Sequence, residues 1–461
     1  MHPPFDIAAD LDTPVSAFLK LGPLQPRFLL ESVEGGMRLA RYSFIGFGDA
    51  LELQMSADDL TVNGETRERP QTQAEYLAVL REALQLAPRP KPDNGELPFT
   101  GGLVGVSGYD VVRMFERLPK NSAPQSHIPD AAFVAPTSML VFDHLTRRVA
   151  VLHDGPEYER QRLRSEVIER LRGPVPRHEG DVVSSPTTAS LSEEEFIERV
   201  AACKEYIASG DIYQIVVSVL FKGQSNVPPF EVYRALRLLN PSPYMFYFDF
   251  DDLQVVGSSP EALVKLNDGI ASLRPIAGTL PRGDTTEQDI ANEKALLADP
   301  KEAAEHVMLV DLARNDLGRV ATAGTVEVDP YRAIERYSHV MHIVSGVQGE
   351  LAPEFDQFDL FAASFPAGTL VGAPKVRAMQ IIEEMEPVGR GLYAGTAGYF
   401  GLEGDMDQAI TIRTLVFSGD EYSFQAGAGI VADSVPAKEY QEVLAKSAIL
   451  RRALQIAGEG L

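Results

Sequence analysis

Hydrophobic and polar positions in the first 172 residues form short apolar runs separated by turns. Runs of this length, bounded by turn residues, are typical of β-strands. A longer stretch predicts a helix over residues 73–87, which ends before the proline-containing segment 88–92. The strands predicted in this part of the chain are 27–32, 40–46, 51–55, 133–142 and 147–153.

Residues 172–191 carry no apolar periodicity and are rich in proline, glycine, serine and threonine. We interpret residues 173–190 as a linker or a long surface loop. This segment would divide the chain into an N-terminal domain, residues 1–172, and a second domain, residues 191–461. The length agrees with two domains, because 461 residues exceed the roughly 250–300 that one hydrophobic core usually supports.

The second domain begins with a helix signal. Ser192 followed by Glu195 predicts a capping box, in which each side chain binds the backbone N–H of the other residue. Many of the strands that follow adjoin in sequence without an intervening helix, so we expect an α+β fold with largely antiparallel sheets. The predicted strands are 212–221, 244–250, 253–257, 338–349, 395–400 and 407–416, and the predicted helices are 286–297, 300–318, 374–385 and 436–456.

Composition and charge narrow the classes of function. With 44% apolar and 23% charged residues, the chain is typical of water-soluble globular proteins. Its net charge of −24 argues against nucleic-acid binding, which needs clustered lysine and arginine. No apolar run is long enough to span a membrane, and the N-terminus lacks a secretory signal. The single cysteine, Cys203, lies in an apolar stretch and is interpreted as a buried small hydrophobic residue, so we expect a cytoplasmic protein.

Two segments carry pairs of glutamates one helical turn apart: Glu302 with Glu305, and Glu439 with Glu442. Each pair would share a helix face, and two such faces opposite each other would make an oxygen-rich cage suited to Mg²⁺. A structural interpretation stands beside this one. Asp299 would cap a helix with Glu302 closing a capping box, and Glu442 would form an ordinary surface ion pair with Lys446. Spacing alone does not decide between them.

Several segments of the second domain carry residue types that packing does not require. The segments are Gly257–Glu261, Arg274–Thr279, Lys301–His306, Asp311–Asp316, His339–His342, Phe365–Leu370, Gly372–Lys375, Ile412–Thr414 and Gly427–Ile430. Together, in this order, they resemble the chorismate-utilising enzymes, and among them the large (synthase) subunits of anthranilate synthases. The resemblance covers essentially residues 190–461, and it implies that family's fold, a two-sub-domain sandwich of largely antiparallel sheets flanked by helices.

The N-terminal domain extends the resemblance. Residues 29–32 and 41–46 look like the tryptophan-binding signature of the same subunits, and residues 101–105 and 108–110 also match the family. Without the family, residues 31–32 would be an ordinary strand end. The resemblance implies that L-tryptophan inhibits the enzyme by binding near Leu30, Glu31, Ser32, Pro243, Tyr244 and Met245.

Within the family, one position separates close relatives. Aminodeoxychorismate synthases typically carry a lysine in the Pro-Ile-x-Gly-Thr motif, and that amine can attack the substrate. Here the position is Ala277, which has no such group and leaves ammonia as the nucleophile. The resemblance implies that Ala277, Gly278 and Thr279 contact chorismate.

The resemblance also assigns the remaining roles. Glu261 is the expected general acid for the departing C4 hydroxyl, and His342 is expected to assist loss of the C2 proton. A zinc pair of His339 and His342 would lack an evident third ligand. The expected substrate contacts are Thr369 and a clamp formed by Tyr393 and Arg413. The backbone of Gly427, Ala428 and Gly429 is expected to form an anion nest, or otherwise a simple strand turn. Lys446 is expected to pair with the acidic cage.

The resemblance implies Mg²⁺ held by Glu302, Glu305, Glu439 and Glu442, with the ion binding the ring carboxylate of chorismate. Because the setting of Cys203 does not suit an amidotransferase nucleophile, ammonia is expected from a separate glutamine amidotransferase subunit. Two alternatives remain: an aminodeoxychorismate synthase, disfavoured by Ala277, and a non-catalytic tryptophan-sensing homologue, disfavoured by the intact Glu261 and His342.

Overall fold

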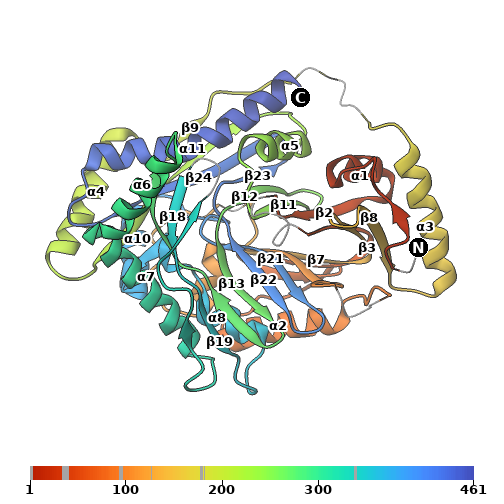
Figure 1. Cartoon of the computed structure of the whole chain (residues 1–461), viewed down its shortest axis with the longest axis horizontal. Coiled ribbons are helices and arrows are strands. Elements are labelled where there is room, and N and C mark those ends of the chain that lie inside the picture. Colours follow the sequence, from red (N-terminus) through yellow and green to blue (C-terminus); the bar gives the residue numbers. More distant parts are fainter. Residues whose placement is uncertain are drawn as a thin grey trace.

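The computed structural model describes residues 4–33, 41–92, 97–125, 127–176, 180, 182–336 and 340–461. Antiparallel strands dominate it, and helices cover them (Figure 1). Over these residues, 21 strands form one continuous hydrogen-bonded sheet, and three more form a small second sheet. The expected α+β fold with largely antiparallel sheets is confirmed.

Strands from both ends of the chain share the large sheet. β2 (Pro26–Glu31) pairs antiparallel with β11 (Tyr244–Asp249), and β6 (Gly102–Ser107) pairs with β21 (Thr396–Gly401). One hydrophobic core also contains buried residues from before position 172 and after position 191. The two predicted domains are therefore joined by backbone hydrogen bonds, and the boundaries at 172 and 191 stay a prediction.

The sheet carries helices on its outer faces. The long β10 (Gln214–Gln224) pairs with β24 (Glu421–Ile430), and α4 (Glu193–Ala208) and α11 (Pro436–Glu459) pack against these strands. The predicted capping box forms at the start of α4: the Ser192 hydroxyl accepts from the Glu195 N–H at 3.2 Å, and the Glu195 carboxylate accepts from the Ser192 N–H at 2.8 Å. None of the helices in the described part of the chain is long and apolar enough to cross a bilayer.

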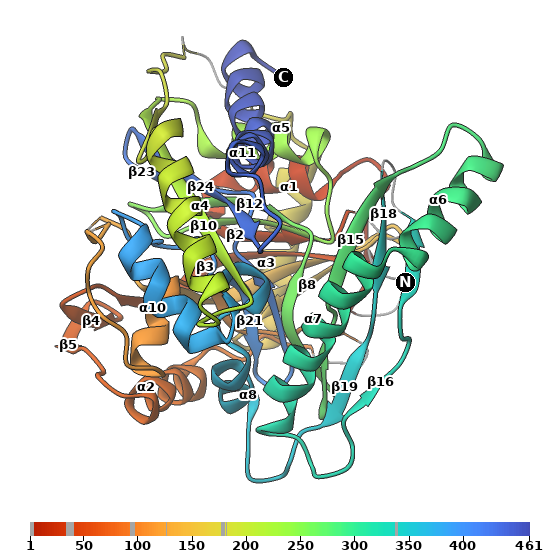
Figure 2. The ribbon, with the colours of Figure 1, turned by 90° about the vertical axis from the view of Figure 1, so that its left-hand side faces the viewer.

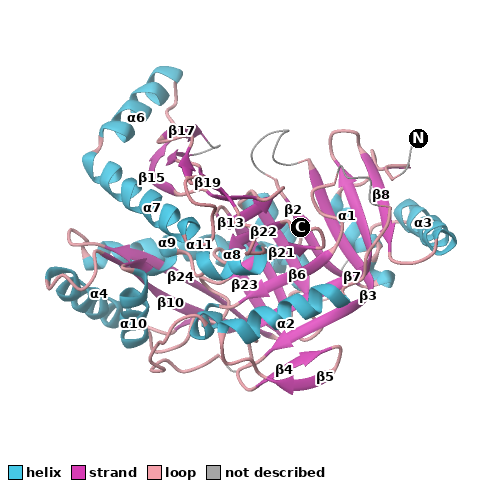
Figure 3. Ribbon diagram, turned by 90° about the horizontal axis from the view of Figure 1, so that it is seen from below, coloured by secondary structure: helices cyan, strands magenta, loops and turns pink. Residues whose placement is uncertain are grey.

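A separate lobe projects from one side of the large sheet (Figures 2 and 3). It consists of the three-stranded sheet β15–β18–β17 and the helices α6 (Thr286–Ala298) and α7 (Pro300–Gly318). In that sheet β18 (Val340–Val344) is the central strand, flanked by β15 (Ile276–Pro281) and β17 (Ala333–Arg336). The other helices are α1 (Pro14–Lys20), α2 (Gln73–Leu86), α3 (Glu157–Arg172), α5 (Pro229–Leu239), α8 (Gln357–Ser364), α9 (Gly368–Val371) and α10 (Lys375–Met385), with 3₁₀ turns at Gly22–Leu24 and Tyr109–Met114.

The remaining strands follow mostly as expected, including β7 (Ala131–Asp143), β8 (Arg148–His153) and β12 (Gln254–Ser259). Short strands that the sequence analysis did not predict complete the sheet. They are β1 (Ile7–Ala8), β4 (Asp59–Val62), β5 (Glu65–Glu68), β9 (Thr188–Ala189), β13 (Ala262–Asn267), β14 (Ile270–Leu273), β16 (Glu327–Val328) and β20 (Gly372–Ala373).

Three predicted strand boundaries were wrong. The strands predicted at 40–46 and 51–55 are one strand, β3 (Tyr42–Met55), which bends at a bulge where Gly48 has φ +83°. The strand predicted at 338–349 is two strands, β18 and β19 (Val347–Glu350), which belong to different sheets. Its first residues, 338 and 339, lie outside the described residues. The strand predicted at 407–416 is also divided, into β22 (Met406–Ile410) and β23 (Thr414–Ser418).

The start of α7 differs from the prediction in one bond. Asp299 caps the helix as expected, and its carboxylate accepts from the backbone N–H groups of Lys301 and Glu302. Glu302 does not close a capping box, because the Asp299 N–H donates to the Ala295 carbonyl at the end of α6, at 3.1 Å. The Glu302 carboxylate is therefore available for another role.

Candidate active site

Glu261 lies between β12 and β13, where it is half-buried. The Thr369 hydroxyl on α9 donates to its Oε1 at 3.2 Å. Burial raises the pKa of Glu261 to about 7, against the smaller lowering effect of the Thr369 hydrogen bond. Both residues line a cavity of about 40 Å³ against α7. The carboxyl therefore carries a proton in a substantial fraction of molecules at neutral pH, which suits a general acid.

His342 lies on β18 and faces the bulged strand β15. Its Nδ1 lies 2.9 Å from the Gly278 carbonyl oxygen. Because a carbonyl only accepts hydrogen bonds, Nδ1 carries the hydrogen, and the neutral ring has its lone pair on Nε2. Gly278 adopts φ +64° at the bulge, a left-handed conformation that glycine accommodates without strain. The bulge thus fixes the tautomer that a proton acceptor at Nε2 requires.

Ala277 and Thr279 flank Gly278 in the same motif. Ala277 is 6% exposed and pairs with Ile343 across the sheet, so it presents no reactive group. Thr279 pairs with His342 through the backbone, and its side chain lies outside the described atoms, as does all of His339.

The two glutamate helices approach each other beside this strand pair. A Cβ on Gly278 would lie 3.0 Å from Glu302 Oε2, which places that carboxylate next to the bulge. Burial raises the pKa of Glu305, and the nearby charges of Glu302 and Glu442 raise it further. The carboxylates of Glu305 on α7 and Glu442 on α11 are therefore close enough to repel each other electrostatically. Glu439 is half-buried one turn earlier on α11.

Over the described ranges, no group of three or more acidic, histidine or cysteine side chains is arranged to hold a metal ion. The donor set still fits Mg²⁺ in kind, since it consists of carboxylate oxygens. The like-charge repulsion at Glu305 is the repulsion that a divalent cation would relieve. Lys446 now offsets part of it: its Nζ lies 2.7 Å from Glu442 Oε1 and 3.1 Å from the Gly427 carbonyl oxygen.

The segment 427–429 is neither an anion nest nor a strand turn, and this part of the prediction was wrong. It is regular extended strand within β24, in which Gly427 faces Ser218, Ala428 faces Val217 and Gly429 faces Val216 of β10. The Ser218 N–H donates to Glu386 and the Gly427 carbonyl accepts from Lys446, so this pair exchanges no ladder bonds. The ladder between β23 and β24 ends at Phe424.

The backbone N–H groups of Gly427 and Gly429 consequently point away from β10, toward an edge that β23 does not cover. A carboxylate can bind at such an edge without a nest. Gly427 also has no room for a side chain, because a Cβ would lie 2.8 Å from the Tyr393 hydroxyl and 2.9 Å from the Val217 carbonyl oxygen.

Arg413 explains the break between β22 and β23. It adopts φ +50°, which interrupts the extended backbone, and its Nη1 lies 3.4 Å from Asn240 Oδ1. A non-glycine residue in this region is strained, and such strain gathers at functional sites. Tyr393, the other half of the expected clamp, is 9% exposed, and burial raises its pKa. The structure places the Tyr393 hydroxyl beside Gly427.

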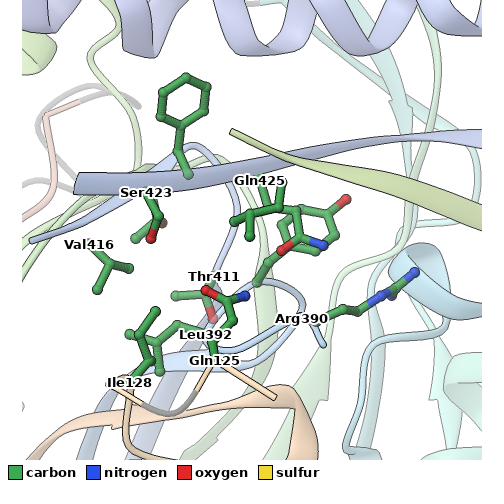
Figure 4. Close-up of a pocket in the computed structure, with 12 residues that line it drawn as sticks. Gln125, Ile128, Arg390, Leu392, Thr411, Val416, Ser423 and Gln425 are labelled. Carbon is green, nitrogen blue, oxygen red and sulfur yellow. The ribbon is translucent and has the colours of Figure 1, made fainter. Parts of the chain in front are cut away.

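Sequence reasoning missed a buried polar cluster next to Tyr393. Arg390, Thr411 and Gln425 line a cavity of about 20 Å³ with Tyr393, and Arg390 extends away from the other labelled side chains (Figure 4). Arg390 forms an ion pair with Glu386 at 2.8 Å. The four-residue spacing of these opposite charges was the only signal in the sequence, and such spacing is common on helix surfaces.

The expected tryptophan-binding residues also come together. β2 and β11 pair so that Glu31 faces Met245, and all six residues line one cavity of about 1530 Å³. The Glu31 carboxylate is turned to α5, where it accepts from Tyr233 at 2.5 Å and from Arg237 Nε at 3.0 Å. The sequence analysis missed the ion pair of Lys265 and Asp407, 2.6 Å long, whose residues line the same cavity. Tryptophan binding here stays a prediction.

Comparison with known proteins identifies the family. Residues 25–452 match the sequence profile of the chorismate binding enzymes, and the chain belongs to that family. It is thus a chorismate-utilising enzyme, and the resemblance expected from its motifs is confirmed.

Among curated relatives, "Anthranilate synthase component 1" of Aquifex aeolicus is 45% identical over 98% of this chain and 94% of its own length. The protein of the same name from Thermus thermophilus is also 45% identical, over 98% and 97%.

Solved structures agree. The crystal structure of anthranilate synthase component I from Streptococcus pneumoniae superposes with a TM-score of 0.81 at 35% identity, covering 98% of this chain and all of that one. The menaquinone-specific isochorismate synthase of Escherichia coli, at 21% identity and a TM-score of 0.70 over 97% and 92% of the two chains, shares the fold.

Proposed function

We propose that the chain is the synthase subunit of an anthranilate synthase, a lyase that converts chorismate and ammonia to anthranilate, pyruvate and water. The observation that carries this proposal is Glu261, a carboxyl whose pKa burial raises to about 7 and whose Oε1 accepts from the Thr369 hydroxyl. The names of the relatives support the same activity. This would be the first committed step of tryptophan biosynthesis, in the cytoplasm.

Chorismate has two carboxylates, and the chain offers groups for both. Arg413 supplies a guanidinium for the enolpyruvyl carboxylate, with Tyr393 nearby. The N–H groups at Gly427 and Gly429 receive the other end of the substrate at the open edge of β24. Glu302, Glu305, Glu439 and Glu442 would hold Mg²⁺, which when bound supplies charge neutralisation for the ring carboxylate.

Glu261 and His342 would carry out the two proton transfers of the reaction. As ammonia adds to ring carbon C2, Glu261 gives its proton to the C4 hydroxyl, which leaves as water, and Thr369 holds the resulting carboxylate. His342 then takes the C2 proton at Nε2, the enolpyruvyl group leaves from C3 to become pyruvate, and the ring becomes aromatic. Ala277 offers no amine to compete with ammonia.

Ammonia would come from a separate glutamine amidotransferase subunit, and tryptophan would bind in the large cavity beside Ser32 and Met245. Binding of the two ligands would be coupled reciprocally, so chorismate should weaken tryptophan binding.

The test is anthranilate fluorescence from the purified chain given chorismate, Mg²⁺ and excess ammonium at alkaline pH, with and without tryptophan. We expect a Mg²⁺-dependent fluorescence signal that tryptophan abolishes. Glutamine supplied in place of ammonium should give no signal, because this chain alone would not release ammonia from it. A 4-amino product would instead indicate an aminodeoxychorismate synthase. Tryptophan binding with chorismate left intact would indicate a sensor and overturn the proposal.

A further inference from the structure

Glu386 and Arg390 form an ion pair deep inside the protein, with side chains that are 3% and 1% exposed. Glu386 follows the last residue of α10, and both of its oxygens accept from the Arg390 guanidinium, at 2.8 and 3.0 Å. Burying two charges is costly unless every partner is supplied, so a pair this deep is weak evidence of a purely stabilising role.

The Arg390 guanidinium reaches two different elements of the site. Nη1 donates to the Leu370 carbonyl at 2.7 Å, and Leu370 follows Thr369 directly on α9. Nη2 donates to the Val216 carbonyl of β10 at 2.8 Å. The guanidinium carbon also lies 5.6 Å from the centre of the Tyr393 ring, within the range of a cation–π contact. The Arg390 guanidinium thus contacts three residues next to the candidate site: Leu370, which follows Thr369; Val216, which lies opposite Gly429; and Tyr393 of the predicted clamp.

Glu386 contacts the same strand, β10, at Ser218. Its Oε1 accepts from the Ser218 N–H at 2.8 Å and from the Ser218 hydroxyl at 2.7 Å. Ser218 lies opposite Gly427, and its Cβ would be 3.1 Å from a Cβ placed there. Gln425, two residues before Gly427 on β24, donates to the same hydroxyl at 2.8 Å.

We propose that Glu386 and Arg390 are positioning residues, which set the distances between Thr369, Tyr393 and the Gly427–Gly429 edge. This inference rests on the proposed function, because it concerns the same site. The pair binds α9 through the Leu370 carbonyl and β10 through Val216 and Ser218, and it lies against the Tyr393 ring. The geometry of the guanidinium fork cannot be reproduced by a lysine ammonium. Misplacement of catalytic groups by about 1 Å can cost about a hundredfold in rate, so a change here should affect catalysis well beyond its effect on folding.

The test compares Arg390→Lys with a matched control, Arg113→Lys. Arg113 forms an ion pair with Glu383, and this pair is also largely buried. Glu383 lies on α10, three residues before Glu386. For Arg390→Lys we expect the KM for chorismate to rise about tenfold or more, together with a shift of the alkaline limb of the pH–rate profile as Glu261 loses its alignment. For Arg113→Lys we expect a similar change in Tm with kinetic constants within about twofold of the parent.

Equal kinetic changes in the two variants would reduce the pair to a structural one, and unchanged kinetics for Arg390→Lys would overturn the proposal. If Arg390→Lys does not fold, Ser218→Ala makes the comparison without leaving a buried charge unpaired, with an expected rise in KM of about threefold or more. Chorismate affinity measured by calorimetry gives the same comparison without turnover. A parent chain that binds chorismate but forms no anthranilate would therefore refute the proposed function and still test this inference.

Discussion

Replacing Glu261 with glutamine removes a carboxyl that holds its proton more tightly in the folded chain than in the unfolded one. Its pKa is about 7 when folded, against 4.5 for the unperturbed group. Below pH 4.5 both states are protonated and the group contributes no difference. Between pH 4.5 and about 7 the unfolded chain loses the proton first, so folding stability falls as the pH rises through this window.

The size of the effect follows from the width of that window. Each pH unit corresponds to about 1.4 kcal/mol, so the ionised Glu261 costs the folded chain about 3 kcal/mol at pH 8. Glu261→Gln carries no charge at any pH and escapes this cost. We therefore expect the free energy of unfolding of the variant, relative to the parent, to increase by about 2 to 3 kcal/mol between pH 5 and pH 8. Over the same range, kcat should be lower by about 10²- to 10⁴-fold, because the general acid is lost.

Urea titrations of both proteins at pH 5, 6, 7 and 8 measure the difference, with the exposed Glu354→Gln as the control for removing one negative charge. A difference between variant and parent that stays constant across the pH range would refute the reasoning, since it would mean that Glu261 titrates alike in both states. A variant that is more stable and less active at pH 8 would show that the acid is kept at the expense of stability.

Three further outcomes are expected. Gly427→Ala should raise the KM for chorismate and lower the free energy of unfolding by about 1–3 kcal/mol, because its Cβ would lie 2.8 Å from the Tyr393 hydroxyl. The control is Gly429→Ala, whose Cβ meets only Gln214 Nε2 at 3.1 Å. Steady-state kinetics and thermal melting should show smaller changes for the control. Glu305→Gln should raise the Mg²⁺ concentration for half-maximal activity by about tenfold or more, and an unchanged Mg²⁺ titration would remove it from the metal site. Cys203 is fully buried with its pKa raised to about 12, so a thiol reagent should label it only in denaturant, and rapid labelling of the native chain would contradict its burial.

Short-range patterns predicted about half of the helices of the described residues, whereas α1, α3, α5, α8 and α9 were not predicted. The helix predicted over 300–318 is α7, and the capping box at Ser192 forms as expected. These features depend on local spacing and on caps, which are written in neighbouring residues. The motif resemblance pointed to Glu261 and His342 as candidates, but it could not state the pKa of Glu261 or the tautomer of His342, which depend on packing around them.

Failures of prediction occurred where tertiary contacts override local pattern. The run from 407 to 416 is strand-like throughout, yet Arg413 adopts φ +50° and divides it. Similarly, the strand predicted to continue through Gly346 breaks there, where the Gly346 N–H donates to the Pro330 carbonyl and its carbonyl accepts from the Asp329 N–H, both at 2.9 Å. Glycines 427 and 429 suggested an anion nest or a turn, whereas both lie in the regular strand β24. None of these constraints is visible in spacing along the chain.

The pairing of β6 with β21 has a consequence for synthesis of the protein. β6 is buried along its whole length, and Gly105 reaches its partner Gly398 only after roughly 290 more residues have been made. At about 5–20 residues per second, the wait is about 15–60 s, during which one edge of a hydrophobic strand lacks its partner. We therefore expect the nascent chain to be a chaperone client, and translation slowed downstream of residue 107 to reduce the yield of folded protein.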